Sequence, residues 1–406
     1  MRSFANIFLI LFLADGGFSL VDELVSLLSP LEPFTALRNL LASSVMVMSV
    51  VVYIGLGIDR RVPKRVFLPL IFFVLFCSLS TWLFPVLSGI KIYGLLAAAA
   101  QVALAMLPFY YFKNGTTRTL TMPPEMVTAP YFSLRNTLTF SAASLVIIPF
   151  VLILSLLSAT NGSMNRYTSG FMRLDPGGLR MTERVYRRDN RTIRLAAMIH
   201  VGDREYYEEL AKSVDAGRTI VLAEGVSDNK KLMADTIDYG KMAGFLGLAS
   251  QHDMRFRGRL IQAEELDSPQ NSPIAGDKQG QPDILRADVD VSNFRPPTIF
   301  FLNALGKELR ESPSFFKGVM AINAWGEKNI TPEMYEIIMD DILHCRNLEV
   351  VRHLEKALVR YDTVVIPWGA LHMKEIEAEI LKRGFTLQEQ HERVSIDFRK
   401  MFLGLL

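Results

Sequence analysis

The sequence predicts an α-helical transmembrane region at the N-terminal side, followed by a C-terminal α/β domain with a mixed central sheet covered by helices on both faces. Two observations lead to this fold class. Apolar runs dominate residues 1–160, whereas residues 161–406 have the charged composition of a soluble domain and contain all six histidines. In the second part, predicted strands alternate with predicted helices, which is typical of α/β domains.

Four apolar runs in the first part are long enough to cross a bilayer, which takes roughly 20 residues. Residues 5–29 differ, because a short apolar run is followed by Asp15, Asp22 and Glu23. We expect a weak or broken span there, with an amphipathic second half. The lipid bilayer is therefore a predicted partner, and the four confident spans cover residues 40–58, 66–87, 93–112 and 138–159.

Lys and Arg residues in the short loops predict the orientation of these spans. The loop 59–65 carries four of them, and the connector 113–137 carries three more. Alternation of the spans then places both loops in the cytoplasm and the C-terminal domain on the extracytoplasmic side. The helices are expected to anchor the domain, since transport usually needs ionisable groups that the four confident spans lack.

Charge and cysteine content exclude some classes of function. The net charge is only +2, so the sequence gives no argument for a nucleic-acid partner. Cys345 is the only thiol after residue 160, and a disulfide within that part is therefore excluded. Cys345 could act as a nucleophile, but a small residue that packs a helix is the preferred interpretation.

Strands and helices of the second part are predicted from apolar periodicity, caps and turn residues. A polar linker is expected after residue 159, a Pro/Gly/Asn-rich loop at 267–283 and a closing hairpin at 385–398. The predicted strands cover residues 182–188, 191–200, 218–224 and 362–367, and the predicted helices cover residues 203–210, 229–250, 331–361 and 373–384.

Three predicted strands end in a polar residue that apolar packing does not explain: His200, Glu224 and His372. Ligands usually bind at the carboxyl ends of strands in open α/β sheets. Two imidazoles and a carboxylate are a common ligand set for a divalent transition metal, which can generate hydroxide from bound water. The alternatives are histidines that pack in the core or cap a helix, and a glutamate that caps the next turn.

Four stretches, taken in this order, resemble the TraB/Tiki superfamily, which includes the Tiki metalloproteases, bacterial pheromone-shutdown proteins and GumN-like proteins. They are "AMIHVGDREYYEEL", "TIVLAEGV", "CRNLEVVRHL" and "VVIPWGALHMKEIEAEILKRGF". The segment from Gly369 to His372 matches the family's second G-x-x-H motif. The segment from Ala197 to His200 matches the first, with alanine in place of glycine.

Two further elements of the family pattern have counterparts here. Glu224 matches the acid that ends the strand after the first motif, and Arg346-Asn347 matches the helix element before the second. Cys345 stands where the family often has glutamate, which removes one acid. The resemblance covers roughly residues 180 to 390.

The resemblance implies a membrane-anchored, metal-dependent hydrolase that cleaves an extracytoplasmic peptide or protein. His200 and His372 would bind a divalent transition metal (Mn, Co, Fe or Zn), and Glu224 would be a ligand or a general base. Arg346 would stabilise an oxyanion or fix a carboxylate, and Asn347 would belong to the same catalytic set. Three alternatives stay open: a non-catalytic relative that sequesters a peptide or signal, an esterase, and a transporter or sensor with an outer regulatory domain.

Other polar residues of the second part carry weaker signals. Asp288 and Asp290 lie on the same face of a predicted strand and could form a second carboxylate pair. The remaining histidines match no motif and are expected at the surface or in packing; they are His252, His344, His353 and His391.

Overall fold

The chain folds into two compact units, Met1–Ser158 and Ala159–Leu406, close to the expected division at residue 160. The computed structural model describes residues 1–28, 34–214, 217–234, 240, 243–244, 248–251, 254, 256–267 and 281–400.

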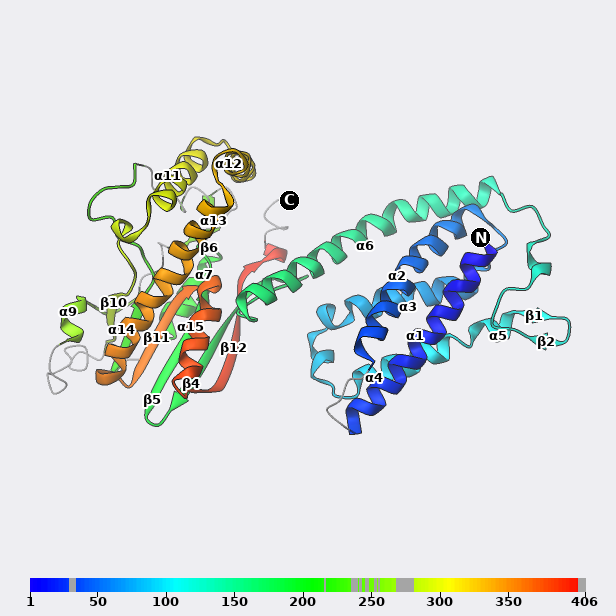
Figure 1. Cartoon of the computed structure of the whole chain (residues 1–406), viewed down its shortest axis with the longest axis horizontal. Helices are drawn as coiled ribbons and strands as arrows, with labels where there is room; N and C mark the ends of the chain where they lie inside the picture. Colours follow the sequence, from blue (N-terminus) through cyan, green and yellow to red (C-terminus); the bar gives the residue numbers. More distant parts are fainter. Residues whose placement is uncertain are drawn as a thin grey trace. The chain divides into compact units, whose positions relative to one another are not determined.

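In the described part of the chain, five helical segments are long and apolar enough to cross a membrane, which suggests that the protein is membrane-associated. The four confident spans expected from the sequence all correspond to such segments. The segments are α1 (Arg2–Leu28), α2 (Thr35–Ile58), α3 (Lys64–Leu83), α4 and α5 together (Tyr93–Leu104 and Leu107–Tyr111), and α6 (Leu134–Thr168); Figure 1 labels them.

The first segment is one continuous helix, not the broken span that its acidic residues led us to expect. The physical reason is that other helices supply partners for these acids. Gln101 of α4 donates to the Asp15 carboxylate over 2.8 Å, and Arg38 of α2 donates to Asp22 over 2.5 Å. Phe8 and Phe12 of α1 are fully buried in the core of this unit.

Short elements connect these helices. Two-residue strands β1 (Lys113–Asn114) and β2 (Thr117–Arg118) form a small antiparallel ribbon, and η1 (Pro85–Gly89) and η2 (Pro124–Val127) are single 3₁₀ turns.

Residues 160–168 were expected to form a polar linker, but they extend α6 as helix. Two of their polar side chains bond to the backbone of β3 (Met172–Asp175). Asn161 accepts from the backbone N–H of Leu174 over 2.8 Å, and Thr168 accepts from that of Met172 over 3.2 Å. These bonds lie within the second unit, to which the end of α6 belongs.

A mixed sheet forms the centre of the second unit, as the sequence predicts (Figure 1). Its strand order is β12-β4-β5-β11-β7-β10-β9, with β3 paired to the first residues of β4, Gly178–Met181. The strands from β5 to β9 in this order run parallel, and β4 is antiparallel to both of its main neighbours. The strands are β3 (Met172–Asp175), β4 (Gly178–Arg188), β5 (Arg191–Met198), β7 (Thr219–Ala223), β9 (Arg259–Ile261), β10 (Asp283–Arg286), β11 (Thr363–Gly369) and β12 (Thr386–Asp397).

Helices α14 (Arg346–Arg360) and α15 (Ala370–Lys382) pack along this sheet. Both contact β11, while α14 also contacts β7 and α15 also contacts β5. The apolar runs of β7 and β11 are buried, as expected for central parallel strands. Other helices among the described residues are α7 (Arg204–Lys212), α9 (Ala263–Leu266), α11 (Pro296–Glu311), α12 (Phe315–Asn329), α13 (Pro332–Met339) and the 3₁₀ turn η4 (Val291–Asn293). Strand β6 (Val201–Gly202) pairs with β8 (Ala249–Ser250).

Three local expectations differ from the structure or fall outside it. The closing hairpin at 385–398 is wrong, because this stretch forms one long strand, β12, along the whole of β4. The sequence between its two apolar parts contains no Gly, Pro, Asn or Asp that would favour a tight turn. Residues 229–234 are not helical, and Ala249–Ser250 form β8 instead of the end of the helix expected at 229–250. Ten of the 22 residues of that expected helix, and most of the loop expected at 267–283, lie outside the described residues.

Candidate functional site

Sheet topology brings the ends of four strands together. Strands β5, β11, β7 and β10 are parallel neighbours in this order, so their carboxyl ends lie at one edge of the sheet. His200 lies two residues beyond β5, and Glu224 directly follows β7. Asp288 lies two residues beyond β10, and His372 is the third residue of α15, which starts where β11 ends. The three residues predicted at strand ends therefore lie at one edge.

Arg346, the first residue of α14, is the centre of the site. Its Nε and Nη2 donate to the two oxygens of Asp288 over 3.0 and 2.7 Å. Nη2 also donates to Oε1 of Glu224 over 2.7 Å, and Nη1 lies 3.2 Å from Nε2 of His372. The guanidinium lies 5.3 Å from the centre of the Trp368 ring. One buried cation thus joins residues from three different strand ends.

A π-helical segment, η5 (Asp340–Cys345), ends at Arg346 and interrupts the helix that was expected to run unbroken from residue 331 to 361. Such bulges are frequently found at functional sites. The segment is held by Asp341, which is buried and accepts from Arg295 Nε over 2.8 Å and from Thr298 Oγ1 over 2.6 Å. The π turn therefore has a fixed attachment, and it sets the position at which Arg346 enters the site.

Among the described residues, one group brings three possible metal-ligand atoms within 4.8 Å of one another: Asp340, Asp341 and Cys345. Arg295 already pairs with both carboxylates, at 2.5 and 2.7 Å. Burial and the two aspartates raise the pKa of the Cys345 thiol above its ordinary value, so a thiolate is disfavoured there. We interpret this group as the attachment of the π turn, in agreement with a packing role for Cys345.

His372 is buried and held from behind by polar side chains. Its Nδ1 lies 2.8 Å from Oδ1 of Asn347, whose Nδ2 donates to Glu375 over 2.6 Å. Because an amide oxygen only accepts, Nδ1 carries the ring proton and Nε2 presents its lone pair toward Arg346 and Glu224. Asn347 is thus a positioning residue that fixes the tautomer of His372.

Glu224 is 4% exposed and has a partner at each oxygen. Oε1 accepts from Arg346, and Oε2 accepts from the backbone N–H of Gly369 over 2.8 Å. Burial alone raises the pKa of this carboxyl, but Arg346, His372, His200 and the Gly369 N–H together lower it below its ordinary value. Glu224 is therefore ionised at neutral pH.

His200 completes the polar end of a cavity of about 580 Å³. Its Nδ1 lies 2.7 Å from Oε1 of Gln251, while Glu224 and Arg346 line the same cavity. The walls are largely apolar and come from Met198, Met233, Met254, Phe256, Phe294, Phe301, Leu302, Leu305 and Ile342. The site is therefore a cavity with apolar walls and a polar floor, which is formed by His200, Glu224 and Arg346.

The predicted ligand set fits a metal in its chemistry, although its atoms are not gathered around one point. Nε2 of His372 lies 3.7 Å from Oε1 of Glu224, but those two and His200 do not come within 4.8 Å of one another. A neutral imidazole and an ionised carboxylate are the protonation states that metal ligands need. With Asp288 and Arg346 counted, the buried cluster carries a formal charge of −1, which favours a further cation.

Two small residues, Gly369 and Ala197, lie close in the sequence to the histidines of the site. Gly369 has φ −52°, and a Cβ there would meet Glu224 and His372 at 3.5–3.7 Å, which is ordinary contact. Glycine is therefore not required by this geometry. Ala197, which replaces a family glycine, is buried, and its carbonyl accepts from Tyr206. The alanine is accommodated without opening the site.

Asp288 is the functional residue that sequence reasoning ranked too low. It enters the site, while Asp290 caps η4 and accepts from Ser227, so the two do not act as a pair on a strand. The sequence signal that could have identified Asp288 is its position two residues after the end of an apolar strand. Gln251 and Glu375, which support the two histidines, were missed. Among the other histidines, His353 is buried, His344 and His391 are exposed, and His252 lies outside the described residues.

The burial of His372 predicts a pH dependence of stability in the metal-free protein. Burial first, and then the charge of Arg346, lower the pKa of His372 to about 4. The unfolded chain binds a proton there below roughly pH 6.5, so its contribution to stability is complete above that pH and is lost as the pH falls toward 4. The free energy of unfolding, measured with denaturant, should therefore fall by up to about 1.4 kcal/mol per pH unit more in the parent than in His372→Gln. Equal slopes would show that His372 is not held neutral.

Comparisons with models of protein families, with curated proteins and with solved structures find no match for this chain.

Proposed function

We propose that the protein is a membrane-anchored, metal-dependent hydrolase of the TraB/Tiki type that cleaves a peptide bond in an extracytoplasmic peptide or protein. The observation that carries the proposal is the buried pair of Glu224, which lines the cavity, and His372, with an ionised carboxylate 3.7 Å from an imidazole nitrogen that bears no proton. His200 lies at the same edge of the sheet and lines the same cavity.

Each residue of the site would have its own role in this reaction. His372 and His200 would hold a divalent transition metal (Mn, Co, Fe or Zn), with Glu224 as third ligand or as the base that takes a proton from water. A bound metal supplies a water of lowered pKa and polarises the scissile carbonyl. Arg346 keeps Glu224 ionised, and its charge can stabilise negative charge that develops on the substrate. Asn347 keeps Nε2 of His372 deprotonated.

The cavity walls define what would bind next to this floor. Aromatic and methionine side chains exclude water and favour an apolar side chain of the substrate. A substrate peptide with a large apolar residue beside the scissile bond fits this arrangement better than a highly charged one.

The test is a cleavage screen with the full-length protein in detergent, using a library of peptides in the presence and absence of a chelator. We expect cleavage that the chelator abolishes and that added Mn²⁺, Co²⁺, Fe²⁺ or Zn²⁺ restores. Cleavage that is unaffected by chelation would contradict the metal-dependent mechanism.

One observation favours a second candidate. Arg346 already pairs with Glu224, and its Nη1 lies 3.2 Å from Nε2 of His372, so this guanidinium competes with a metal for both groups. A metal-free relative that sequesters a peptide or signal, or that hydrolyses an ester, would keep this arrangement. Peptide binding without cleavage in the same screen would favour sequestration, and cleavage of esters alone would favour an esterase.

Loop charges lead us to expect the C-terminal unit on the extracytoplasmic side. Residues 59–65 carry four Lys or Arg residues, and α6 is the last segment able to cross before the second unit. A reporter that is active only outside the cytoplasm should be active when it is fused after residue 170, beyond the end of α6. A reporter that is active only in the cytoplasm should be active when it is fused within 113–133. The reverse pattern would contradict this topology and require an intracellular substrate.

A further inference from the structure

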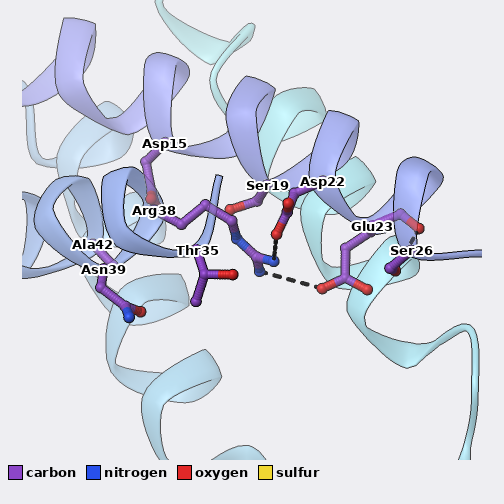
Figure 2. A pocket seen from close by; sticks show the side chains of 9 residues that line it. All are labelled: Asp15, Ser19, Asp22, Glu23, Ser26, Thr35, Arg38, Asn39 and Ala42. Carbon is purple, nitrogen blue, oxygen red and sulfur yellow. Dashed lines mark hydrogen bonds and ion pairs between the residues drawn. The ribbon is translucent and has the colours of Figure 1, made fainter. Parts of the chain in front are cut away.

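The helices of the first unit contain a polar pocket of about 300 Å³ between α1 and α2 (Figure 2). Sequence reasoning preferred an anchoring role for these helices and kept transport as an alternative. The pocket is lined from α1 by Asp15, Ser19, Asp22, Glu23 and Ser26, and from α2 by Thr35, Arg38, Asn39 and Ala42.

Asp15 lies at the deep end of this pocket. It is 7% exposed, and α1 extends 13 residues from it in each direction, from Arg2 to Leu28. At 1.5 Å per residue this places the carboxylate roughly 20 Å from either end of the helix. Its Oδ2 accepts from Gln101 Nε2 over 2.8 Å, whereas its Oδ1 is buried with no hydrogen-bond partner in the described part of the chain.

The pocket has more negative than positive charge. Arg38 pairs with Asp22 at 2.5 Å and with Glu23 at 3.2 Å, as the dashed lines in Figure 2 show. With both of those carboxylates and Asp15 ionised, the lining carries three negative charges and one positive charge. Gln101 of α4 is neutral, and Cys77 of α3 is the further titratable group that interacts with Asp15. An uncompensated carboxylate inside an apolar helix is costly, so intramembrane acids usually mark functional sites.

We propose that this pocket binds a small cation, a proton or a metal ion, on the Oδ1 side of Asp15. Apart from the guanidinium of Arg38, the polar groups of the lining are carboxylates, hydroxyls and one amide, and oxygen ligands suit hard cations. Asp22 and Glu23 lie in the last two turns of α1, so the lining leads from that end of the helix to its middle. The proposal does not rest on the hydrolase function, because it uses residues of the first unit alone.

The experiment compares thermal unfolding of the full-length protein in detergent with Asp15→Asn and with Glu125→Gln, which removes an exposed carboxylate in the same unit. Each protein is measured in NaCl, KCl and choline chloride at equal ionic strength, at acidic and at mildly alkaline pH. In alkaline choline chloride, Asp15→Asn should unfold at a higher Tm than the parent, because the amide removes the uncompensated charge. Glu125→Gln should behave like the parent.

The two sources of cation give different results. A metal site raises the Tm of the parent in Na⁺ or K⁺ relative to choline, and Asp15→Asn loses this increase. A proton site raises the Tm of the parent at acidic pH in every salt, and again only Asp15→Asn loses the increase. If Asp15→Asn responds to salt and pH as the parent does, the proposal is wrong.

A second measurement covers the case in which Asp15→Asn does not fold. Infrared difference spectra of the parent, recorded on exchange of choline for Na⁺ and on acidification, should contain a carboxyl band from a buried group whose hydrogen exchange is slow. Spectra without such a band in either exchange overturn the proposal.

Discussion

Replacement of Arg346 by methionine is expected to lower the free energy of unfolding of the C-terminal unit by about 3–5 kcal/mol. The side chains of Glu224 and Asp288 are 4% and 0% exposed, and Arg346 is the cation that pairs with both. Without it, two carboxylates remain buried close together and must either repel each other or take up protons. Arg346→Lys should lose less, because an ammonium keeps the charge but cannot make the paired hydrogen bonds of the guanidinium.

Denaturant-induced unfolding followed by tryptophan fluorescence measures this effect, since Trp368 lies against Arg346. The matched control is Arg352→Met on the same helix, whose side chain is 59% exposed and pairs with Glu349. That change should cost no more than about 1 kcal/mol. Equal losses in the two variants would mean that the buried network does not depend on Arg346.

The second large effect concerns catalysis. Glu224→Gln and His372→Ala are each expected to reduce the rate of substrate cleavage by roughly 100-fold or more. The glutamine keeps the shape of Glu224 but cannot bear its negative charge, and the alanine removes the nitrogen that lies 3.7 Å from that carboxylate. His391→Ala is the control, because His391 is exposed on β12 and pairs only with Glu389 among the described contacts.

The two variants also separate the possible roles of Glu224. If Glu224 acts as a base, Glu224→Gln loses rate but keeps its affinity for metal. If Glu224 is a ligand, the variant loses both rate and affinity. Full activity in His372→Ala would return His372 to the role of a packed core histidine, held by Asn347 for structural reasons alone.

The sequence predicted the edge of the sheet better than the interactions at that edge. The apolar runs before His200, Glu224 and His372 identify strands, and parallel strands present their carboxyl ends together. The position of β11 between β5 and β7 places His372 beside Glu224, and no local pattern encodes that order. The position of Asp288 depends on the loop after β10, and the direction of the Arg346 side chain depends on the π turn that Asp341 holds. Both depend on contacts between residues far apart in the chain, from Asp341 to Arg295 and from Arg346 to Asp288.

The same limit explains the wrong expectation for α1. Asp15 and Asp22 argue against a span when the segment is considered alone, because a carboxylate in an apolar helix is costly. Their partners, Gln101 and Arg38, come from other helices and are 86 and 16 residues away in the chain. Local hydropathy therefore could not distinguish a broken span from a continuous helix with a polar pocket.

The most direct test of the central claim is the metal content of the purified full-length protein, measured by elemental mass spectrometry for the parent, His372→Ala and His391→Ala. If Glu224 and His372 hold a divalent ion together with His200, the parent and His391→Ala should contain about one Mn, Co, Fe or Zn per chain after incubation with the metals and desalting. His372→Ala should contain far less. A parent without metal, or a His372→Ala variant with as much metal as the parent, would contradict a metal site at the end of β11.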